Sequence, residues 1–286
     1  MNAFKRQCIE LRKRDYTLLE IVKITGRPKT SVHFHIRGLP LSAEKRRKIG
    51  EANAARARAI AFRRRRLSAK KISRFHIWNG AAVSLVAHLL FDGEIKYGAC
   101  VYSNRNIALI GRVENFMKTI YPVEPKRYTN GLTGVFRISY YNVSLVEYIK
   151  EKSVQLLQNI HSMSRECKRE FLRSFFDDEG CIDYKLEINQ RRIRGYQKKV
   201  EILSIVEGLL HDFDIESHIQ LPNEIVMVGK GNLLKFQREI NFSPGVRING
   251  KRSNSIWKRP LEKRLLLRKA IASYKPIGSN GVHIGQ

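Results

Sequence analysis

The sequence has few acidic residues and few cysteines, and it lacks a long apolar run. Only 26 Asp and Glu stand against 54 Lys and Arg, so the formal net charge is +28. Lys and Arg that neutralise phosphates release counterions and supply most sequence-independent affinity for nucleic acid. The shortage of acids therefore indicates a nucleic-acid partner, with an anionic membrane surface as the alternative.

The missing apolar run argues against a membrane protein. A spanning helix needs about 18 or more apolar residues, and no stretch approaches this; no signal-peptide pattern opens the chain either. The four cysteines (Cys8, Cys100, Cys167 and Cys181) are far apart and form no CxxC pair. We therefore expect reduced thiols in a cytoplasmic protein, with a nucleoid-associated or organellar location as alternatives, and neither a zinc site nor a disulfide framework.

The hydrophobic residues that are present allow two or three compact units, since they make up 43% of 286 residues. The first, residues 1–42, shows a helix-turn-helix pattern. Thr17 and Glu20 form a capping box, Gly26 supplies the turn, and Val32 with Ile36 anchors a second helix. The alternative is a helical hairpin with only a packing role.

The second helix of this pattern would expose polar side chains, as a major-groove reader does. The candidate DNA-binding residues here are Lys29, Thr30, Ser31, His33 and Arg37. Residues 43–75 follow as a basic helical linker. It includes Arg63 and Arg64 as candidate phosphate contacts; a solvated linker or a localisation signal is the alternative.

A pattern in the remaining chain occurs twice. An apolar helix ends in acids and a glycine at Asp177, Asp178, Glu179 and Gly180, and an earlier helix ends at Asp92 and Gly93. Carboxylates at a helix C-terminus lie against the negative end of the macrodipole, so a bound cation is expected to compensate them. Gly180 fits the left-handed position that stops a helix. The alternative is two packed core helices with ordinary termination.

Each copy is followed by a run of alternating apolar and polar residues, which predicts a half-buried strand. These runs are GEIKYGACVYSN, starting at Gly93, and IDYKLEINQRR, starting at Ile182. With the helices and strands expected after them, the order is αββαββα in both copies. We therefore predict an α+β protein with repeats over residues 76–163 and 164–286, the second including a basic C-terminal tail.

LVAHLLFDG (85–93) and LRSFFDDEG (172–180) resemble the two signature helices of a monomeric LAGLIDADG homing endonuclease. The resemblance covers roughly residues 78–274. It implies a pseudo-two-fold arrangement with saddle-shaped antiparallel sheets on duplex DNA. Small residues at Ala87 and Ser174 would let the two helices approach closely and bring Asp92 and Glu179 together.

Two adjacent carboxylates repel unless a hard cation lies between them, and oxygen ligands suit Mg²⁺. The resemblance makes Asp92 and Glu179 the metal ligands and catalytic residues. It implies a basic catalytic residue as well, for which Lys251 or Arg252 in GKRSN is the candidate, and the first repeat has no clear equivalent. Asp177 and Asp178 are expected to be helix-end or DNA-proximal acids. The saddle would read the major groove through its polar strand faces, with Lys96, Tyr102, Arg137, Lys185, Asn189, Arg191 and Arg192 as candidates.

The sequence thus predicts a monomeric, Mg²⁺-dependent endonuclease that cuts double-stranded DNA at specific sites, as intron-encoded homing enzymes do. One alternative is a transcriptional regulator that keeps the saddle for DNA binding and no longer cuts. Another is a maturase that uses the same fold on RNA.

Overall fold

The computed structural model describes residues 2–68, 72–96, 98–250 and 258–274, with the side chains of 63–68 left out. The chain divides into two compact units, Met1–Arg66 (unit 1) and Leu67–Gln286 (unit 2). Each unit has its own hydrophobic core. Among the described helices, none combines the length and the apolar composition that crossing a bilayer requires.

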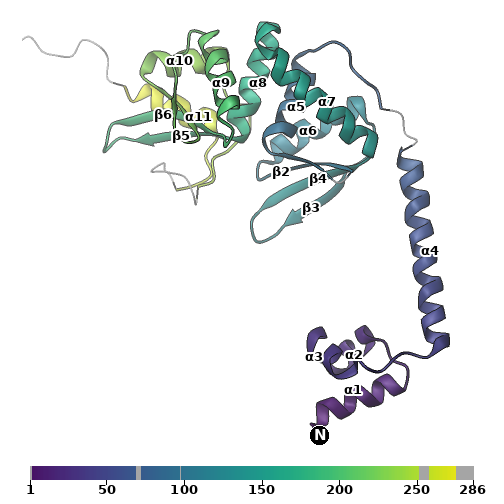
Figure 1. Ribbon diagram of the computed structural model, residues 1–286. Coiled ribbons are helices and arrows are strands. Elements are labelled where there is room, and N and C mark those ends of the chain that lie inside the picture. The colour runs from purple at the N-terminus through teal and green to yellow at the C-terminus, as the bar shows by residue number, and fades with distance from the viewer. Residues whose placement is uncertain (1, 69–71, 97, 251–257, 275–286) are drawn as a thin grey trace, which may run out of the picture. The chain divides into compact units, whose positions relative to one another are not determined.

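Unit 1 begins with three short helices, α1 (Ala3–Lys13), α2 (Leu18–Thr25) and α3 (Lys29–Ile36) (Figure 1). Their core consists of Cys8, Ile21, Val32 and Ile36. The predicted capping box is present: the Glu20 amide donates to the Thr17 hydroxyl (3.3 Å), and the Thr17 amide donates to the Glu20 carboxylate (2.6 Å). Gly26 ends α2 in the left-handed conformation, with φ 64°.

A long helix, α4 (Ala43–Ser68), follows. None of its described side chains is fully buried. Ion pairs one turn apart, Lys48 with Glu44 (2.6 Å) and Arg47 with Glu51 (2.9 Å), support its N-terminal part. A helix that is polar on all sides has no face for a protein core.

Unit 2 contains the two repeats, and both have the predicted order αββαββα. The first repeat comprises α5 (Gly80–Phe91), β1 (Gly93–Lys96), β2 (Ala99–Asn104), α6 (Ile107–Ile120), β3 (Lys126–Asn130), β4 (Val135–Tyr141) and α7 (Val143–Asn159). The second comprises α8 (Arg165–Asp178), β5 (Gly180–Lys185), β6 (Gln190–Tyr196), α9 (Val200–His211), β7 (His218–Gln220), β8 (Glu224–Val228) and α10 (Lys230–Glu239), and α11 (Lys263–Ala272) closes the unit.

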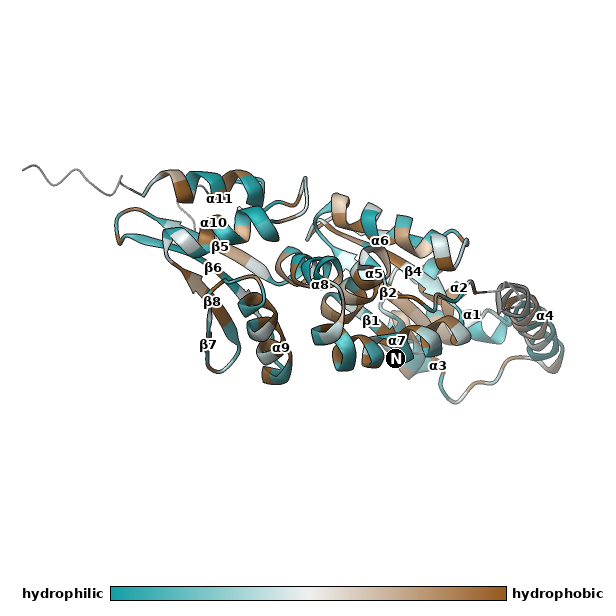
Figure 2. Ribbon diagram, turned by 90° about the horizontal axis from the view of Figure 1, so that it is seen from above, coloured by the Kyte–Doolittle hydropathy of each residue, from teal (hydrophilic) through white to brown (hydrophobic). Residues whose placement is uncertain are grey.

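Each repeat forms one four-stranded antiparallel sheet, with the orders β1-β2-β4-β3 and β5-β6-β8-β7. The two registers correspond, because Gly93 faces Tyr102 in the first sheet and Gly180 faces Gly195 in the second. Helices cover one side of both sheets (Figure 1). Helices such as α9 show alternating hydrophobic and hydrophilic stripes, as expected for helices with one buried face (Figure 2).

Helices α5 and α8 pack against each other at the centre of unit 2. Close approach depends on small residues: the Ser84 and Ser174 hydroxyls lie 3.2 Å apart, and a Cβ on Gly80 would lie 2.7 Å from Oε1 of Glu166. Ala87 is fully buried. Helix α5 belongs to both cores, with Val83 in the second-repeat core and Leu85 in the first.

Residues 241–250, after α10, also join the two repeats. Val246 is fully buried in the core of the first repeat. The Arg247 amide donates to the Asn106 side chain (2.8 Å), and Arg112 on α6 donates to the Ser243 hydroxyl (2.7 Å). The repeats are therefore fastened both through their central helices and through this crossing segment.

Both runs predicted as single strands are hairpins. In the first, Gly98 lies in a turn at φ 71° between β1 and β2. The turn changes which residues point inward, so Cys100 and Tyr102, expected on the polar face, are buried. In the second run, Leu186 and Ile188 lie on an exposed turn between β5 and β6 and not on a buried strand face.

Candidate functional site

The two central helices end at the predicted acids. Asp92 follows α5 and Glu179 follows α8, each as the C-terminal cap residue. The residue after each acid must be glycine, because a side chain at that position would clash with the preceding helix. A Cβ would lie 2.1 Å from the Leu89 carbonyl oxygen at Gly93, and 2.3 Å from that of Phe176 at Gly180. The expectation of a left-handed Gly180 is wrong, because that residue already begins β5 and its φ is not positive.

The two carboxylates have raised pKa values. Burial, and then the charge of Asp178, raises the pKa of Asp92 to about 7. Burial, and then the charge of Asp92, raises the pKa of Glu179 to about 8. The charge of Asp92 therefore opposes ionisation of Glu179, the charge of Asp178 opposes ionisation of both, and a cation would relieve this repulsion.

This pair fits a small divalent cation. Mg²⁺ is usually bound by one or two carboxylates together with waters and phosphates. Within the described residues, no group of three or more His, Cys, Asp or Glu side chains is arranged to hold a metal. Two carboxylates are therefore the donors that the helix ends offer. The Asn104 amide donates to Oδ2 of Asp92 (2.8 Å), which fixes the orientation of that carboxylate.

Asp178 is held inside the protein by side chains of the first repeat. Nδ1 of His88 lies 2.8 Å from its Oδ2, and the Tyr102 hydroxyl donates to its Oδ1 (2.6 Å). The prediction that Tyr102 contacts DNA is therefore wrong: the side chain is 1% exposed, and its hydroxyl is committed to Asp178. Nor is Asp178 a DNA-proximal acid, since its side chain is fully buried.

Asp177 is buried as well, and it lies close to a lysine that sequence analysis did not single out. The Ser243 amide donates to Oδ1 of Asp177 (2.9 Å). Lys263, 4% exposed, donates from Nζ to the carbonyl oxygens of Phe176 (2.9 Å) and Asp177 (2.7 Å). This ammonium caps α8 at its negative end. In the sequence, Lys263 stands among many basic residues, so no local signal distinguishes it.

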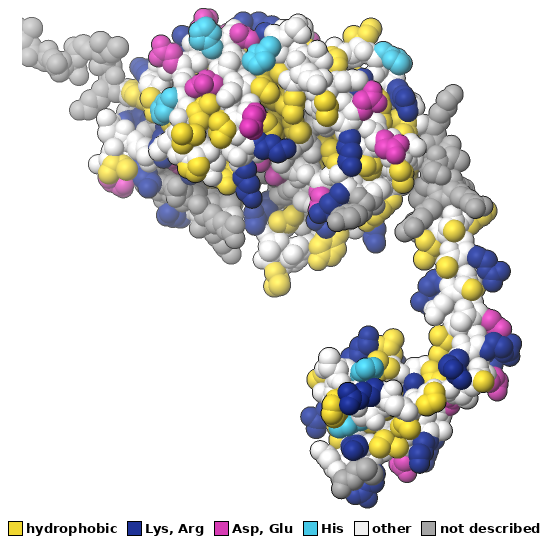
Figure 3. All heavy atoms as spheres, in the orientation of Figure 1, with side chains coloured by type: hydrophobic (Ala, Val, Ile, Leu, Met, Phe, Trp, Pro, Cys, Tyr) yellow, Lys and Arg dark blue, Asp and Glu magenta, His cyan; other side chains and the backbone are white. Residues whose placement is uncertain are grey.

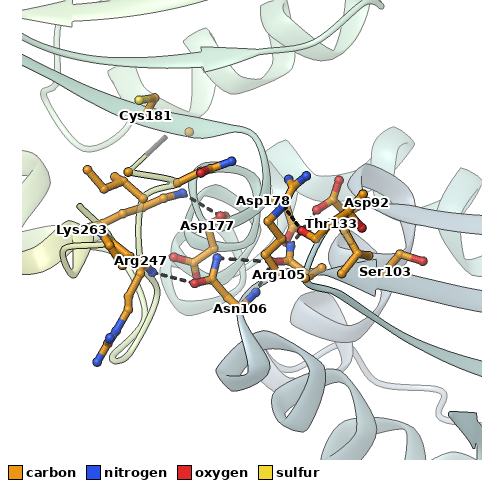
Figure 4. A pocket seen from close by; sticks show the side chains of 18 of the residues that line it. Asp92, Ser103, Arg105, Asn106, Thr133, Asp177, Asp178, Cys181, Arg247 and Lys263 are labelled. Atoms are coloured by element: carbon orange, nitrogen blue, oxygen red, sulfur yellow. Dashed lines mark hydrogen bonds between the residues drawn. The ribbon is translucent and has the colours of Figure 1, made fainter. Parts of the chain in front are cut away.

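The two acids open onto different cavities. Asp92 lines a cavity of about 1040 Å³, together with Asp177, Asp178 and Lys263 (Figure 4). Glu179 lines a smaller one of about 250 Å³ with Tyr196 and residues 197–199. The two halves of the site therefore differ in size and in lining.

The candidate strand residues fall into two groups. Lys96 and Arg137 are exposed and Lys185 is half-buried. Lys96 pairs with Glu94, and Arg137 donates to the Ser103 hydroxyl (3.1 Å). The other three candidates are also bound by neighbours, and two of them, Arg191 and Arg192, are half-buried. Arg192 pairs with the buried Asp183 (2.8 Å), and Arg191 donates to the Ser273 hydroxyl (2.7 Å) and also to Asn189. Their guanidinium groups thus hold the second sheet together.

The polar residues of α3 lie at the surface of unit 1. Those predicted to face DNA, namely Lys29, Thr30, Ser31, His33 and Arg37, are all exposed. The Arg37 guanidinium lies over the Phe34 ring, 5.0 Å from its centroid. Arg63 and Arg64 fall within α4, but their side chains lie outside the described residues, and Lys251 and Arg252 lie outside them altogether.

Comparison with solved structures finds 40 similar chains, including the following three. One belongs to the mesophilic variants of the homing endonuclease I-DmoI, with 16% identity, TM-score 0.44, and coverage of 58% of this chain and 94% of that one. The N-terminal LAGLIDADG domain of DUF199/WhiA is similar at 16% identity and TM-score 0.45, covering 60% and 88%. Full-length DUF199/WhiA from Thermatoga maritima is similar at 16% identity and TM-score 0.47, covering 72% and 65%.

Comparison of sequences gives a narrower result. No curated protein matches the chain. Residues 166–241, from the start of α8 to just beyond α10, match the family model of the LAGLIDADG-like domain. The match contains Glu179 and the whole second sheet, and it confirms the resemblance drawn from the signature helices. Residues 166–241 of this chain are therefore similar to a LAGLIDADG-like domain.

Proposed function

We propose that the protein is a homing-type endonuclease that cuts double-stranded DNA at specific sites with the help of Mg²⁺. The observation that carries the proposal is the pair formed by Asp92 and Glu179, at the ends of two packed helices. Burial and the charge of Asp178 raise the energy of ionising both acids, and the charge of Asp92 adds to this for Glu179. Without a ligand, such repulsion destabilises the folded protein. It favours binding of a divalent cation, which in turn can bind a phosphate.

Asp92 and Glu179 would hold the cation, and Asn104 would keep the Asp92 carboxylate oriented toward it. When bound, Mg²⁺ supplies a Lewis acid that activates water and stabilises the leaving oxygen of a phosphodiester. The buried Lys263 would offset part of the acid charge between turnovers, because its charge lowers the pKa of both carboxylates.

DNA contacts would come from both units. In unit 2, the exposed Lys96 and Arg137 and the half-buried Lys185 are suited to phosphates or base edges. In unit 1, we propose that α3 enters a major groove and that α4, with Arg63 and Arg64, follows the backbone. Residues 1–42 would then read the target, and residues 43–75 would link them to the rest of the chain. Residues 76–163 and 164–286 would each supply one half-site, so that a monomer carries both.

A second candidate is a regulator that binds DNA without cutting it. It is favoured by the way the end of α8 is compensated internally: Asp178 is bound by His88 and Tyr102, and Lys263 caps the helix. A site compensated in this way can persist with no metal. The two candidates then differ in cleavage and not in DNA binding.

Cleavage of plasmid DNA separates these candidates. The full chain is incubated with plasmids carrying the DNA that flanks its own gene, with Mg²⁺ or with a chelator. The nuclease proposal predicts linear product with Mg²⁺ alone. Specific binding without cleavage at any site in Mg²⁺ would refute it and establish the regulator.

A matched pair of variants assigns the chemistry. Glu179→Gln should abolish cleavage and leave binding unchanged, because it removes one ligand charge and keeps the shape. Glu147→Gln, at an exposed position on α7, is the control and should cut like the wild type. Equal cleavage by Glu179→Gln and the control would remove Glu179 from the mechanism.

A further inference from the structure

Each repeat presents an exposed leucine at the tip of its second hairpin. Leu132, between β3 and β4, is 99% exposed, and Leu221, between β7 and β8, is 73% exposed. The two sheets have corresponding strand orders, so these hairpins are equivalent elements of the two repeats. A leucine in water adds nothing to the hydrophobic core, and these two leucines occupy equivalent tips of the two repeats.

The first tip is held in a fixed shape. Oδ1 of Asn130 accepts from the amides of Leu132 (3.0 Å) and Thr133 (3.1 Å), and the Gly134 amide donates to the Asn130 carbonyl (2.8 Å). Gly134 adopts φ 67°, which favours glycine. Nε of Arg105 donates to the Thr133 carbonyl (3.0 Å) and so ties the tip to the end of β2. The leucine is thus presented by a rigid loop.

The first tip lines the cavity of one acid, and the second tip is linked to the cavity of the other through one backbone hydrogen bond. Leu132 and Thr133 line the same cavity as Asp92. In the second repeat, the Asn223 carbonyl, two residues after Leu221, accepts from the Gln197 amide (2.8 Å). Gln197 lines the cavity of Glu179. Each leucine is therefore connected to the loop that flanks one of the two acids.

The surroundings of the tips specify the chemistry of the partner. Arg105 and Arg247 are exposed residues that line the cavity beside Leu132. On the sheet side of unit 2, Lys and Arg side chains lie next to apolar ones (Figure 3). Guanidinium groups around an isolated aliphatic side chain match duplex DNA, whose phosphates take the positive charges and whose stacked bases offer an apolar interior.

We propose that Leu132 and Leu221 are a pair of wedges that enter the base stack of bound duplex DNA, one from each repeat. This inference rests on the proposed binding of double-stranded DNA. Each wedge would open one base step on the side that it enters and bend the duplex away from that side. The energy of unstacking would come from the phosphate contacts that the bend allows.

Base unstacking is measured with 2-aminopurine, whose fluorescence rises when it leaves the stack. A duplex that the full chain binds is first selected from a randomised pool, and 2-aminopurine then replaces one base at a time. Binding of the wild type should raise the fluorescence severalfold at two separate positions. Leu132→Asn should abolish the rise at one position and Leu221→Asn at the other, while both variants still bind.

Val154→Asn is the matched control, because Val154 is a 56% exposed aliphatic residue on α7, away from the hairpin tips. It should keep both rises. Wild-type binding without any rise, or variants that retain both rises, would overturn the wedge and leave DNA binding intact. A wild-type chain that binds no duplex from the pool would overturn the wedge and the proposed function together.

Discussion

The Tyr102 hydroxyl of the first repeat donates a 2.6 Å hydrogen bond to the Asp178 carboxylate of the second. The equivalent positions carry different residues. Gly195 corresponds to Tyr102, since each faces the glycine after an acid, and Phe91 corresponds to Asp178, since each precedes an acid. A Cβ on Gly195 would lie 2.4 Å from the Phe175 ring. A polar cluster on one side of the helix pair is thus matched by an apolar one on the other.

Removing the Tyr102 hydroxyl should weaken the contact between the repeats. In Tyr102→Phe, Oδ1 of the buried Asp178 loses its strongest donor, and a hydrogen bond to a charged group contributes about 1.5–3 kcal/mol. We expect the free energy of unfolding, measured by urea titration, to fall by about that amount. Tyr141→Phe, at a 54% exposed tyrosine on β4, is the control. Equal stability of the two variants would contradict the assigned role of this bond.

Local sequence patterns predicted the order of elements and the ends of the central helices. The capping box at Thr17 and Glu20, and the acids and glycines that end α5 and α8, depend on residues close together in the chain. Such features are decided by backbone geometry and by spacing of apolar residues, both of which a sequence displays. The domain boundaries and the roles of the acids stay predictions.

The surroundings of the acids could not be predicted, because they depend on contacts across the fold. Lys263 reaches the end of α8 from a helix that begins more than 80 residues later. The inward orientation of Tyr102 follows from one turn at Gly98, which shifts the alternation of a strand that otherwise reads as continuous. Only the packed structure reveals which of many basic and aromatic residues face the site.

The stability of the protein should fall as the pH rises through the neutral range when no divalent cation is present. The pKa of Glu179 is raised from its ordinary value of 4.5 to about 8, so the folded state holds a proton that the unfolded state releases. Stability is therefore lost as the pH rises from about 4.5 to about 8. Thermal unfolding between pH 5 and pH 8.5 in a chelator should show this fall.

Glu179→Gln should reduce that slope, because the amide does not ionise. Its melting temperature should exceed that of the wild type at pH 8.5 and match it at pH 5. Glu147→Gln should keep the slope of the wild type, since Glu147 is exposed. A slope that is unchanged in Glu179→Gln would show that this carboxylate does not titrate in the neutral range.

Lys263 should be essential for the stability of unit 2. Lys263→Met keeps most of the volume but removes the ammonium that donates to two carbonyl groups and faces the buried Asp177. Removing one partner of a buried charge pair costs about 3–5 kcal/mol. Arg268→Met, at an exposed position on the same helix, is the control and should stay close to wild type. The free energy of unfolding of both variants is measured by urea titration. If Lys263→Met were as stable as Arg268→Met, the ammonium of Lys263 would not be needed as a counter-charge.

The exposed cations of α3 should contribute phosphate contacts of unit 1. Lys29→Ala and Arg37→Ala remove cations next to the proposed groove-reading residues, and each lost phosphate contact lowers the slope of log binding constant against log salt by about 1. Lys13→Ala, at the exposed end of α1, is the control and should leave the slope unchanged. The slope is measured with the full chain on one bound duplex at several salt concentrations. If Lys29→Ala and Arg37→Ala kept the slope of the wild type, as the control should, α3 would not lie against the phosphate backbone. Recognition would then have to come from unit 2.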